Sequence, residues 1–391
     1  MRKYITLVFI CLFAFEVIGQ SIPLSDEAEI RVLTFGPDQD NLYSSFWHSG
    51  IRVIDRKSNI DWVYDYGRFD FDNPNFYTDF AKGYLRYSMG VADYPRLKAV
   101  YIYHNRSIEE QVINLNPLQK QKLFDYLQNN RKPENRHYFY DYYYNNCATK
   151  IRDVFKEVLG DSIRFDLDYV EVGLSFRQLT DSCTVYQPWG DYGIDLALGQ
   201  PIDKKASSWE YMFLPEFIKK GFGAAEVITK SGIQPAVANY QLTYKATEEN
   251  YSNGWMTPHS IFWLLFILTV LITLWNWMKQ VHGKWFDFVF FLVLGIAGII
   301  LCFIWFATDH HAAANNYNVV WALPTHVLIA GLLISRKYDR VLTIYFYLTL
   351  GISIILLLSW NFIPQQLHTA NIPIVLAVAL RSIHIIKFRK K

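Results

Sequence analysis

The strongest constraint on this chain is an abrupt change in composition at Pro258. Residues before it read as a mixed globular sequence, whereas nearly all residues after it are apolar. Apolar segments close to the roughly 17 to 25 residues needed to cross a bilayer recur there. They lie at 260–277, 286–306, 320–334, 341–362 and 372–388. We therefore expect a globular domain followed, at residues 258–391, by an all-α transmembrane bundle of about five helices, the third of them short.

The charges of the loops between these segments indicate how the bundle is oriented across the membrane. The sequences KQVHGK, SRKYDR and KFRKK together hold nine Lys and Arg residues, whereas TDHHAAANNYN and PQQLHTAN hold none. Lys and Arg concentrate in cytoplasmic loops. The first helix is therefore expected to begin outside the cytoplasm and the C-terminus to lie inside it.

The N-terminus indicates export independently of the loops. Arg2 and Lys3 precede an apolar run, which is typical of a signal peptide at residues 1–19, with an uncleaved anchor helix as the alternative. Either form places residues 20–257 on the periplasmic face of a bacterial inner membrane. Nucleic acid is not an expected partner, because the formal net charge is only +2 and no basic patch is interleaved with aromatic residues.

The exported part reads as a small α+β domain at residues 20–185, followed by an extension and linker at residues 186–257. Asn116 and Pro117 mark the start of a predicted helix at 116–130. Runs rich in β-branched and aromatic residues, bounded by turn residues, predict the strands. These strands are expected at 28–36, 46–55, 59–72, 97–104 and 136–144.

Cys147 is the residue that points most directly to chemistry. It begins a predicted helix with an apolar face of helical periodicity, and Asn145 or Asn146 is a natural cap. Free backbone N–H groups and the positive end of the helix dipole stabilise a thiolate at such a position. We therefore expect a nucleophile. A disulfide with Cys183 and an inert buried cysteine are the alternatives.

A thiolate nucleophile needs a base and a group that orients this base. His48 is the preferred base because it begins a predicted strand and is followed by two small residues, whereas His104 and His137 read as surface residues. The orienting group should come from the neighbouring predicted strand, whose register the sequence does not give. The candidates on that strand are Tyr64, Asp65 and Tyr66.

A polar loop between the second and third membrane segments also suggests function. Polar groups at that depth are costly unless they have a partner or a role. A solvated interfacial turn is the alternative to a contact with a lipid headgroup or a substrate. Adjacent histidines rarely bind one metal ion together, so no metal is expected. The candidate substrate-binding residues are His310, Asn316 and Asn318.

The order of a histidine on an early strand and a cysteine at a later helix start is the reverse of the papain order. It resembles the circularly permuted, NlpC-type papain-like enzymes. More closely, the chain is similar to the Lnb family of bacterial lipoprotein N-acyltransferases. The matching sequences are TFGPDQDNLYSSFWHSGIRVID, VYDYGRFDFDNPNF, YDYYYNNCATKIRD and DHHAAANNYNVVWALP. One departure is Trp47, which precedes the histidine where a glycine is usual in that family.

The resemblance implies transfer of a fatty acyl chain from a membrane phospholipid to the α-amine of the diacylglyceryl cysteine of a lipoprotein. His48 would activate Cys147, which would carry the chain as a thioester without any cofactor. The Cys147 N–H and the side chain of Asn146 are candidates for holding the oxyanion. A membrane-anchored cysteine peptidase or amidase acting on cell-wall peptide, and a non-catalytic envelope scaffold, are the alternative functions.

Overall fold

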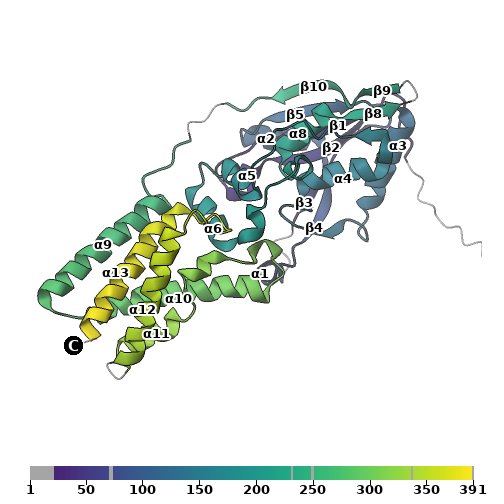
Figure 1. Cartoon of the computed structure of the whole chain (residues 1–391). Helices are drawn as coiled ribbons and strands as arrows, with labels where there is room; N and C mark the ends of the chain where they lie inside the picture. The colour runs from purple at the N-terminus through teal and green to yellow at the C-terminus, as the bar shows by residue number, and fades with distance from the viewer. Residues whose placement is uncertain (1–21, 70–73, 230–231, 248–250, 336–337, 390–391) are drawn as a thin grey trace, which may run out of the picture.

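The computed structural model describes residues 22–69, 74–229, 232–247, 251–335 and 338–389 (Figure 1). The predicted signal peptide lies outside these residues. A β-sheet covered by helices comes first along the chain, and a bundle of long helices follows. The predicted order of an α+β domain and then a helical membrane bundle is confirmed.

The first part is built on a seven-stranded sheet whose pairings are antiparallel. The order of the strands is β10-β5-β1-β2-β3-β4-β6. The strands are β1 Glu29–Phe35, β2 His48–Asp55, β3 Ile60–Arg68, β4 Arg86–Asp93, β5 Ile108–Ile113, β6 His137–Phe139 and β10 Val237–Tyr244. A smaller sheet contains β7 Ile163–Arg164, β8 Glu226–Thr229 and β9 Gly232–Pro235.

Each face of the large sheet has its own hydrophobic core, because successive residues of a strand point to opposite sides. Val32 of β1 joins the core formed by Phe124 of α3, Phe155 of α4 and Phe222 of α8. Its neighbour Leu33 joins the core on the α2 side. The helices are α1 Phe76–Lys82, α2 Tyr94–Tyr103, α3 Pro117–Asn130, α4 Cys147–Leu159, α5 Phe176–Cys183, α6 Pro188–Ala197, α7 Ser208–Tyr211 and α8 Pro215–Ala224.

Both helices predicted in this domain are confirmed, as α3 and α4, but the strand predicted at 97–104 is wrong because these residues belong to α2. Their aromatic and β-branched side chains favoured a strand. However, Tyr94, Leu97 and Tyr101 recur at helical spacing and pack on the sheet. Pro95 lies in the first turn, where its fixed φ favours helix initiation.

Residues 186–257, expected to be an extension and linker, contribute to the fold of the exported domain. β10 pairs with β5 and forms one edge of the sheet. Phe222 of α8 packs in the main core, 4.9 Å from the ring of Phe155. The domain therefore continues to Tyr244, past the boundary expected at residue 185. Most side chains of β10 are exposed, so the strand lacks the alternation that marks a half-buried one.

Four helices in the described part of the chain are long and apolar enough to cross a membrane. They are α9 Pro258–Lys279, α10 Lys284–Ala307, α12 Asp339–Leu358 and α13 Ile372–Arg389. The third predicted segment, 320–334, contains only the short helix α11 His326–Leu333. At about 1.5 Å per residue, α11 rises only ~12 Å.

The third segment nevertheless runs from one end of the bundle to the other. Just before it, Asn318 donates to the backbone oxygen of Asp195 in the exported domain, at 3.1 Å. Just after it, the backbone oxygen of Ser335 accepts from Arg389 at the far end of α13, at 3.2 Å. The chain therefore passes through the bundle five times, with α11 and irregular backbone making the third passage.

Two glycines of α10 allow this irregular backbone to pack closely. A β-carbon at Gly298 would lie 1.8 Å from the backbone oxygen of Ala322, and one at Gly295 would lie 2.4 Å from the nitrogen of Val327. Non-helical backbone at membrane depth is tolerated where protein surrounds it. Small residues permit such close approach between membrane segments.

Candidate active site

Cys147 occupies the first position of α4, as predicted, and Asn146 is its cap. Asn146 Oδ1 accepts hydrogen bonds from the N–H groups of Ala148 and Thr149, each at 2.9 Å, and Thr149 Oγ1 accepts from the Asn146 N–H at 2.8 Å. This reciprocal capping box fixes the start of the helix. The Cys147 N–H has no acceptor among the residues that the structure describes. The thiol therefore lies beside a free donor at the positive end of α4.

Asn146 itself has no donor left for an oxyanion. Its Nδ2 donates to the backbone oxygens of Tyr142 and Phe213, at 2.8 Å each, and the residue is buried. The candidate role of Asn146 in holding an oxyanion is therefore not supported by its contacts. Asn146 positions the helix start, and the free Cys147 N–H is the donor that remains.

Strands β2 and β3 bring His48 and Asp65 together. Gly50 pairs with Asp65, so His48, two residues before Gly50, lies on the same face of the sheet. His48 Nε2 lies 3.3 Å from Asp65 Oδ2. Cys147 is also a neighbour of this imidazole, since its interactions contribute to the pKa of His48. The histidine therefore lies near both a carboxylate and the thiol.

The pKa of His48 is raised well above its usual value of 6.5. Burial alone acts to lower this pKa, because it penalises the charged imidazole, but the electrostatic interaction with Tyr101 opposes it. Interactions with Cys147 and the hydrogen bond to Asp65 add to this opposition and outweigh the burial. The surroundings thus favour a protonated imidazole.

Asp65 is held by a second partner, Arg68, which sequence reasoning missed. Arg68 Nε donates to Asp65 Oδ1 at 2.7 Å, while Asp65 Oδ2 faces His48. Burial raises the pKa of Asp65, but the bonds and charges of His48 and Arg68 outweigh it and the pKa is lowered. Gly90, which pairs with Asp65 on β4, leaves room for Arg68, since a β-carbon there would lie 1.9 Å from Arg68 Nε.

A bulge in β3 brings the strand against the thiol. The register between β3 and β4 shifts between Asp65 and Arg68, and Gly67 within the bulge has a φ of +91°. A β-carbon at Gly67 would lie 3.5 Å from the β-carbon of Cys147. Gly67 therefore meets both demands of its position, a left-handed backbone and a close neighbour.

Tyr64 and Tyr66 face the opposite side of the sheet from Asp65. Both belong to the main core under α3 and α4. The Tyr66 hydroxyl donates to Asn130 Oδ1 at 2.6 Å, and Gln128 Nε2 donates to the Tyr64 hydroxyl. The structure therefore brings Asp65, and not Tyr66, to the histidine.

Trp47 adopts a backbone conformation that is rare for residues other than glycine. It follows the 3-10 helix η1 Leu42–Phe46 with φ 63° and ψ −170°. Such a conformation costs on the order of 1–3 kcal/mol for a residue with a β-carbon. Glycine is usual at this place in the family that the sequence resembles, so the departure introduces strain in the residue directly before His48.

The structure also bears on the possible disulfide and on the two histidines that the sequence places at the surface. Cys147 and Cys183 are both free thiols, which contradicts a disulfide between them. Burial raises the pKa of the Cys183 thiol to about 11, so that thiol is neutral. His104 and His137 are exposed, as the sequence predicts.

The polar loop of the membrane domain forms the junction with the exported domain. His310 Nε2 lies 2.9 Å from the backbone oxygen of Phe80 in α1. Asn316 Nδ2 donates to the backbone oxygens of Leu196 and Ala197 at 2.8 and 3.1 Å, and Asn316 is buried. These contacts are made with protein at the end of α6 and in α1.

Asn318, expected to contact substrate, is also committed to protein. Its Nδ2 donates to the backbone oxygens of Asp195 and Leu196, and its Oδ1 accepts from Trp321 Nε1 and Asn371 Nδ2 at 3.1 Å each. The side chain is fully buried. Asn316 and Asn318 therefore hold the two domains together, and a substrate-binding role for them is not supported.

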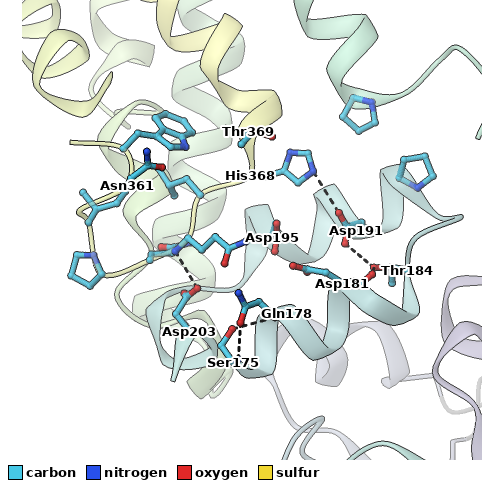
Figure 2. Close-up of a pocket in the computed structure, with 18 of the residues that line it drawn as sticks. Ser175, Gln178, Asp181, Thr184, Asp191, Asp195, Asp203, Asn361, His368 and Thr369 are labelled. Atoms are coloured by element: carbon cyan, nitrogen blue, oxygen red, sulfur yellow. Dashed lines mark hydrogen bonds and ion pairs between the residues drawn. The ribbon is translucent and has the colours of Figure 1, made fainter. Parts of the chain in front are cut away.

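A cavity of about 830 Å³ lies at this junction and contains neither Cys147 nor His48 (Figure 2). One wall is a face of α5 that includes Ser175, Gln178 and Asp181, and another is the chain between α12 and α13, with His368. The opposite face of α5 packs toward Tyr143 in the segment that leads to Cys147, since Phe176 and Tyr143 lie 5.1 Å apart. One helix thus separates the cavity from that segment.

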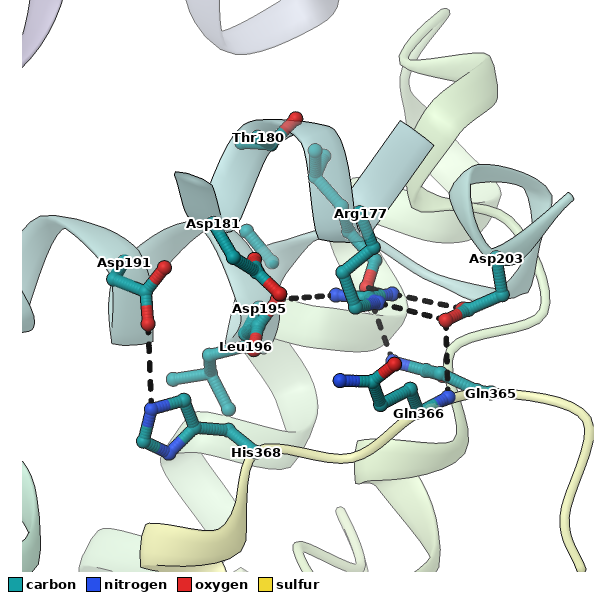
Figure 3. Close-up of polar contacts among 12 residues, drawn as sticks. Arg177, Thr180, Asp181, Asp191, Asp195, Leu196, Asp203, Gln365, Gln366 and His368 are labelled. Atoms are coloured by element: carbon teal, nitrogen blue, oxygen red, sulfur yellow. Dashed lines mark hydrogen bonds and ion pairs between the residues drawn. The ribbon is translucent and has the colours of Figure 1, made fainter. Parts of the chain in front are cut away.

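Four carboxyl groups line this cavity, those of Asp181, Asp191, Asp195 and Asp203, and the buried Arg177 pairs with two of them (Figure 3). Arg177 donates to Asp195 Oδ1 at 2.5 Å and to Asp203 Oδ1 at 2.9 Å. Burial, and then the charges of Asp195 and Asp191, raise the pKa of Asp181 to about 8. The Asp181 carboxyl is therefore mostly protonated at neutral pH.

Within the described residues, the cavity also holds one group of possible metal-ligating side chains. One atom from each of Asp191, Asp195 and His368 lies within 4.8 Å of the others. Asp191 Oδ2 and His368 Nε2 are 3.5 Å apart. Such a spacing is common in acidic groups that bind no metal, and the expectation that no metal is bound stays a prediction.

A domain with a cysteine at a helix start and a histidine–aspartate pair nearby, joined to long apolar helices, indicates a membrane-anchored protein. Family models extend this class to a particular family. Residues 26–182 match the Lnb N-terminal periplasmic domain, and residues 249–391 match the Lnb transmembrane domain. The chain belongs to the Lnb family, and its first domain is periplasmic. No curated protein and no solved structure gives a significant match.

Proposed function

We propose that this protein is a lipoprotein N-acyltransferase. It moves an acyl chain from a membrane phospholipid, through a thioester on Cys147, to the α-amine of the diacylglyceryl cysteine of a lipoprotein. The observation that carries the proposal is the His48–Asp65 pair in the neighbourhood of Cys147, with Cys147 at the start of α4. Membership of the Lnb family supports the class of reaction.

The first half of the reaction forms the thioester. The Cys147 thiolate attacks the ester carbonyl of the phospholipid, and the protonated His48 gives its proton to the leaving lysophospholipid oxygen. The Cys147 N–H donates to the oxyanion that develops on the carbonyl oxygen. Asp65 stays ionised and holds the imidazole in place throughout.

The second half transfers the chain to the lipoprotein. The neutral amine attacks the thioester carbonyl, and the now neutral His48 accepts the proton that the amine loses. The carbon–sulfur bond breaks, and the thiolate and protonated imidazole are restored. No cofactor takes part. The proton that His48 gives to the lysophospholipid is replaced by the proton that it accepts from the amine.

The proposed location is the inner membrane, with the C-terminus in the cytoplasm. The excess of Lys and Arg in the connections at one end of the bundle supports this orientation. Cysteine residues introduced at Asn253 and Lys279 test it with a reagent that does not cross membranes. We expect labelling of intact spheroplasts at Asn253 only, and labelling at Lys279 would contradict the orientation.

Complementation tests the proposed reaction. A bacterium depleted of its own lipoprotein N-acyltransferase receives the protein, and mass spectrometry of its lipoproteins detects a third acyl chain. We expect that chain with the native protein and none with Cys147→Ala or His48→Ala. Cys183→Ala is the matched control, because this thiol is free and neutral, and it should retain acylation.

Two results would contradict the proposal. One is a third chain with Cys147→Ala, which would exclude the thioester. The other is a native protein that releases free fatty acid or cleaves cell-wall peptide and adds no chain, which would favour a hydrolase.

A further inference from the structure

Five aromatic rings form a continuous series between the membrane domain and Cys147. Successive ring centroids lie 6.1, 5.9, 5.4 and 4.5 Å apart. These separations are within the range of direct contact between aromatic rings. We call this series the aromatic track, and its members in order are Phe80, Phe76, Phe69, Tyr87 and Tyr140.

The first ring of the aromatic track is fixed at the membrane domain. The His310 ring lies 6.2 Å from the ring of Phe80, and the Asp309 N–H donates to the backbone oxygen of Lys82 at 2.8 Å. Gly83, with a φ of +86°, ends α1 so close to the loop that a β-carbon would lie 2.8 Å from the carbonyl carbon of Asp309. Helix α1 is therefore docked at the end of α10, as Figure 1 shows.

The last ring of the aromatic track reaches the thiol. A β-carbon at Gly67 would lie 3.6 Å from Tyr140 Cε2 and 3.5 Å from the β-carbon of Cys147. Tyr140 and Cys147 therefore both lie beside Gly67. The charge of Cys147 also contributes to the raised pKa of Tyr140, after burial, as expected for close neighbours.

Exposure differs among the members of the aromatic track. Phe80 is 42% exposed and Phe69 37%, whereas Phe76 and Tyr140 are half-buried and Tyr87 is 9% exposed. Burial raises the pKa of Tyr87 to about 12. The two tyrosines at the thiol end are therefore less accessible to water than Phe80 and Phe69, which favours a thioester over its hydrolysis.

We propose that the aromatic track binds the fatty acyl chain of the phospholipid donor and leads its ester to Cys147. This inference rests on the proposed function, and it names the site of the donor chain. The occupant is an acyl chain because the track begins beside the end of a membrane helix, ends beside the nucleophile, and presents aromatic rings throughout, three of them phenylalanines.

The test separates binding of a long chain from reactivity of the thiol. The full-length protein in detergent is mixed with dipalmitoyl phosphatidylethanolamine or with the water-soluble ester p-nitrophenyl acetate, and acylation of Cys147 is followed by intact-protein mass spectrometry. The variant is Phe76→Ser combined with Phe80→Ser. Loss of two apolar contacts should lower the rate with the phospholipid by about ten-fold or more. The rate with the acetate should stay within about two-fold.

Two further variants make the outcome specific. Phe76→Leu combined with Phe80→Leu keeps the apolar surface and should restore most of the phospholipid rate. Tyr103→Ser changes an aromatic residue that is 85% exposed on α2 and outside the aromatic track, and it should have no effect.

If the serine variant lowers the acylation rate equally with both donors, or leaves the rate with the phospholipid unchanged, the proposed role of the aromatic track is wrong. A native protein that reacts with the acetate but never with the phospholipid overturns the proposed function instead. The two failures are therefore distinguishable.

Discussion

Asp65 is the residue on which the geometry of the site depends. One of its oxygens faces His48 and the other accepts from Arg68, so the carboxylate is held from two sides. A carboxylate fixed in this way sets the orientation of the imidazole and stabilises its charged form. In the proposed mechanism, the strand that carries Asp65 thus controls the orientation of the base that serves Cys147.

Asp65→Asn should slow alkylation of Cys147 by iodoacetamide at pH 7 by about ten-fold or more. The change weakens the hydrogen bond that helps to raise the pKa of His48 and leaves the imidazole less firmly oriented. Asp61→Asn, on the same strand but paired with Arg52, is the control. Identical alkylation rates for the Asp65 variant and the native protein would refute this role.

Asp181→Asn should stabilise the protein increasingly as pH rises from 5 to 8. Burial, and then Asp195 and Asp191, raise the pKa of Asp181 to about 8, far above its unfolded value of 3.8. The folded state therefore binds this proton more tightly, and stability is lost as the carboxyl ionises between these values. The slope should be below ~1.4 kcal/mol per pH unit, because the side chain is partly solvated.

Thermal unfolding in detergent at several pH values measures this effect. The difference between the melting temperatures of the Asp181 variant and the native protein should widen with pH. Asp161→Asn, a substitution at an exposed carboxylate, should show no such trend. A constant difference across the range would show that Asp181 titrates normally.

Residue type and local context were sufficient to predict Cys147 at the start of a helix with an asparagine cap, and His48 on a strand. The choice between Asp65 and Tyr66 was not predictable, because a shift of one residue in strand register exchanges the two faces. Arg68 was missed because its contact depends on the bulge in β3. A glycine inside a predicted strand was the signal that could have indicated this bulge.

At the scale of elements, the site depends on a glycine of β4 that leaves space for a side chain of β3. Gly90 lies opposite Asp65, and the absence of a side chain lets Arg68 cross the strand. The helices with clear caps were predictable from the sequence. Helix α2 was not, because its aromatic residues suit a strand equally well, and β10 was not, because an exposed edge strand carries little pattern.

Gly90→Ala should lower the alkylation rate of Cys147 to the level of Arg68→Gln. The new β-carbon would lie 1.9 Å from Arg68 Nε, so the flexible side chain must leave Asp65. Stability should change by less than about 1 kcal/mol, since only an exposed end moves. The double variant should be no slower than either single one. Additive losses would indicate that Gly90 acts by another route.

At the scale of the whole molecule, buried asparagines join the two domains and the acidic cavity lies between them. The single side chain of Asn318 makes hydrogen bonds with α6, Trp321 and Asn371. The sequence predicted both domains and their order. It did not predict this junction, because the sequence around an asparagine in an outer loop does not show whether its side chain contacts lipid, substrate or protein.

Asn318→Ala should loosen the junction while leaving the thiol intact. Loss of the amide leaves buried donors and acceptors unpaired, at a cost of about 1–3 kcal/mol for each group. Hydrogen exchange at the end of α6 should accelerate, and acylation of Cys147 from phospholipid should fall while that from p-nitrophenyl acetate is kept. Asn239→Ala, on the exposed face of β10, is the control. Unchanged exchange in α6 would contradict the role of Asn318.

The position of β10 has a consequence for biogenesis. This edge strand is the last strand before the first membrane helix, yet its partner β5 lies far earlier in the chain. If the chain is exported from its N-terminus as proposed, the sheet cannot close until Tyr244 has emerged, shortly before α9 enters the bilayer. Completion of the periplasmic sheet and insertion of the first membrane helix would therefore be nearly simultaneous.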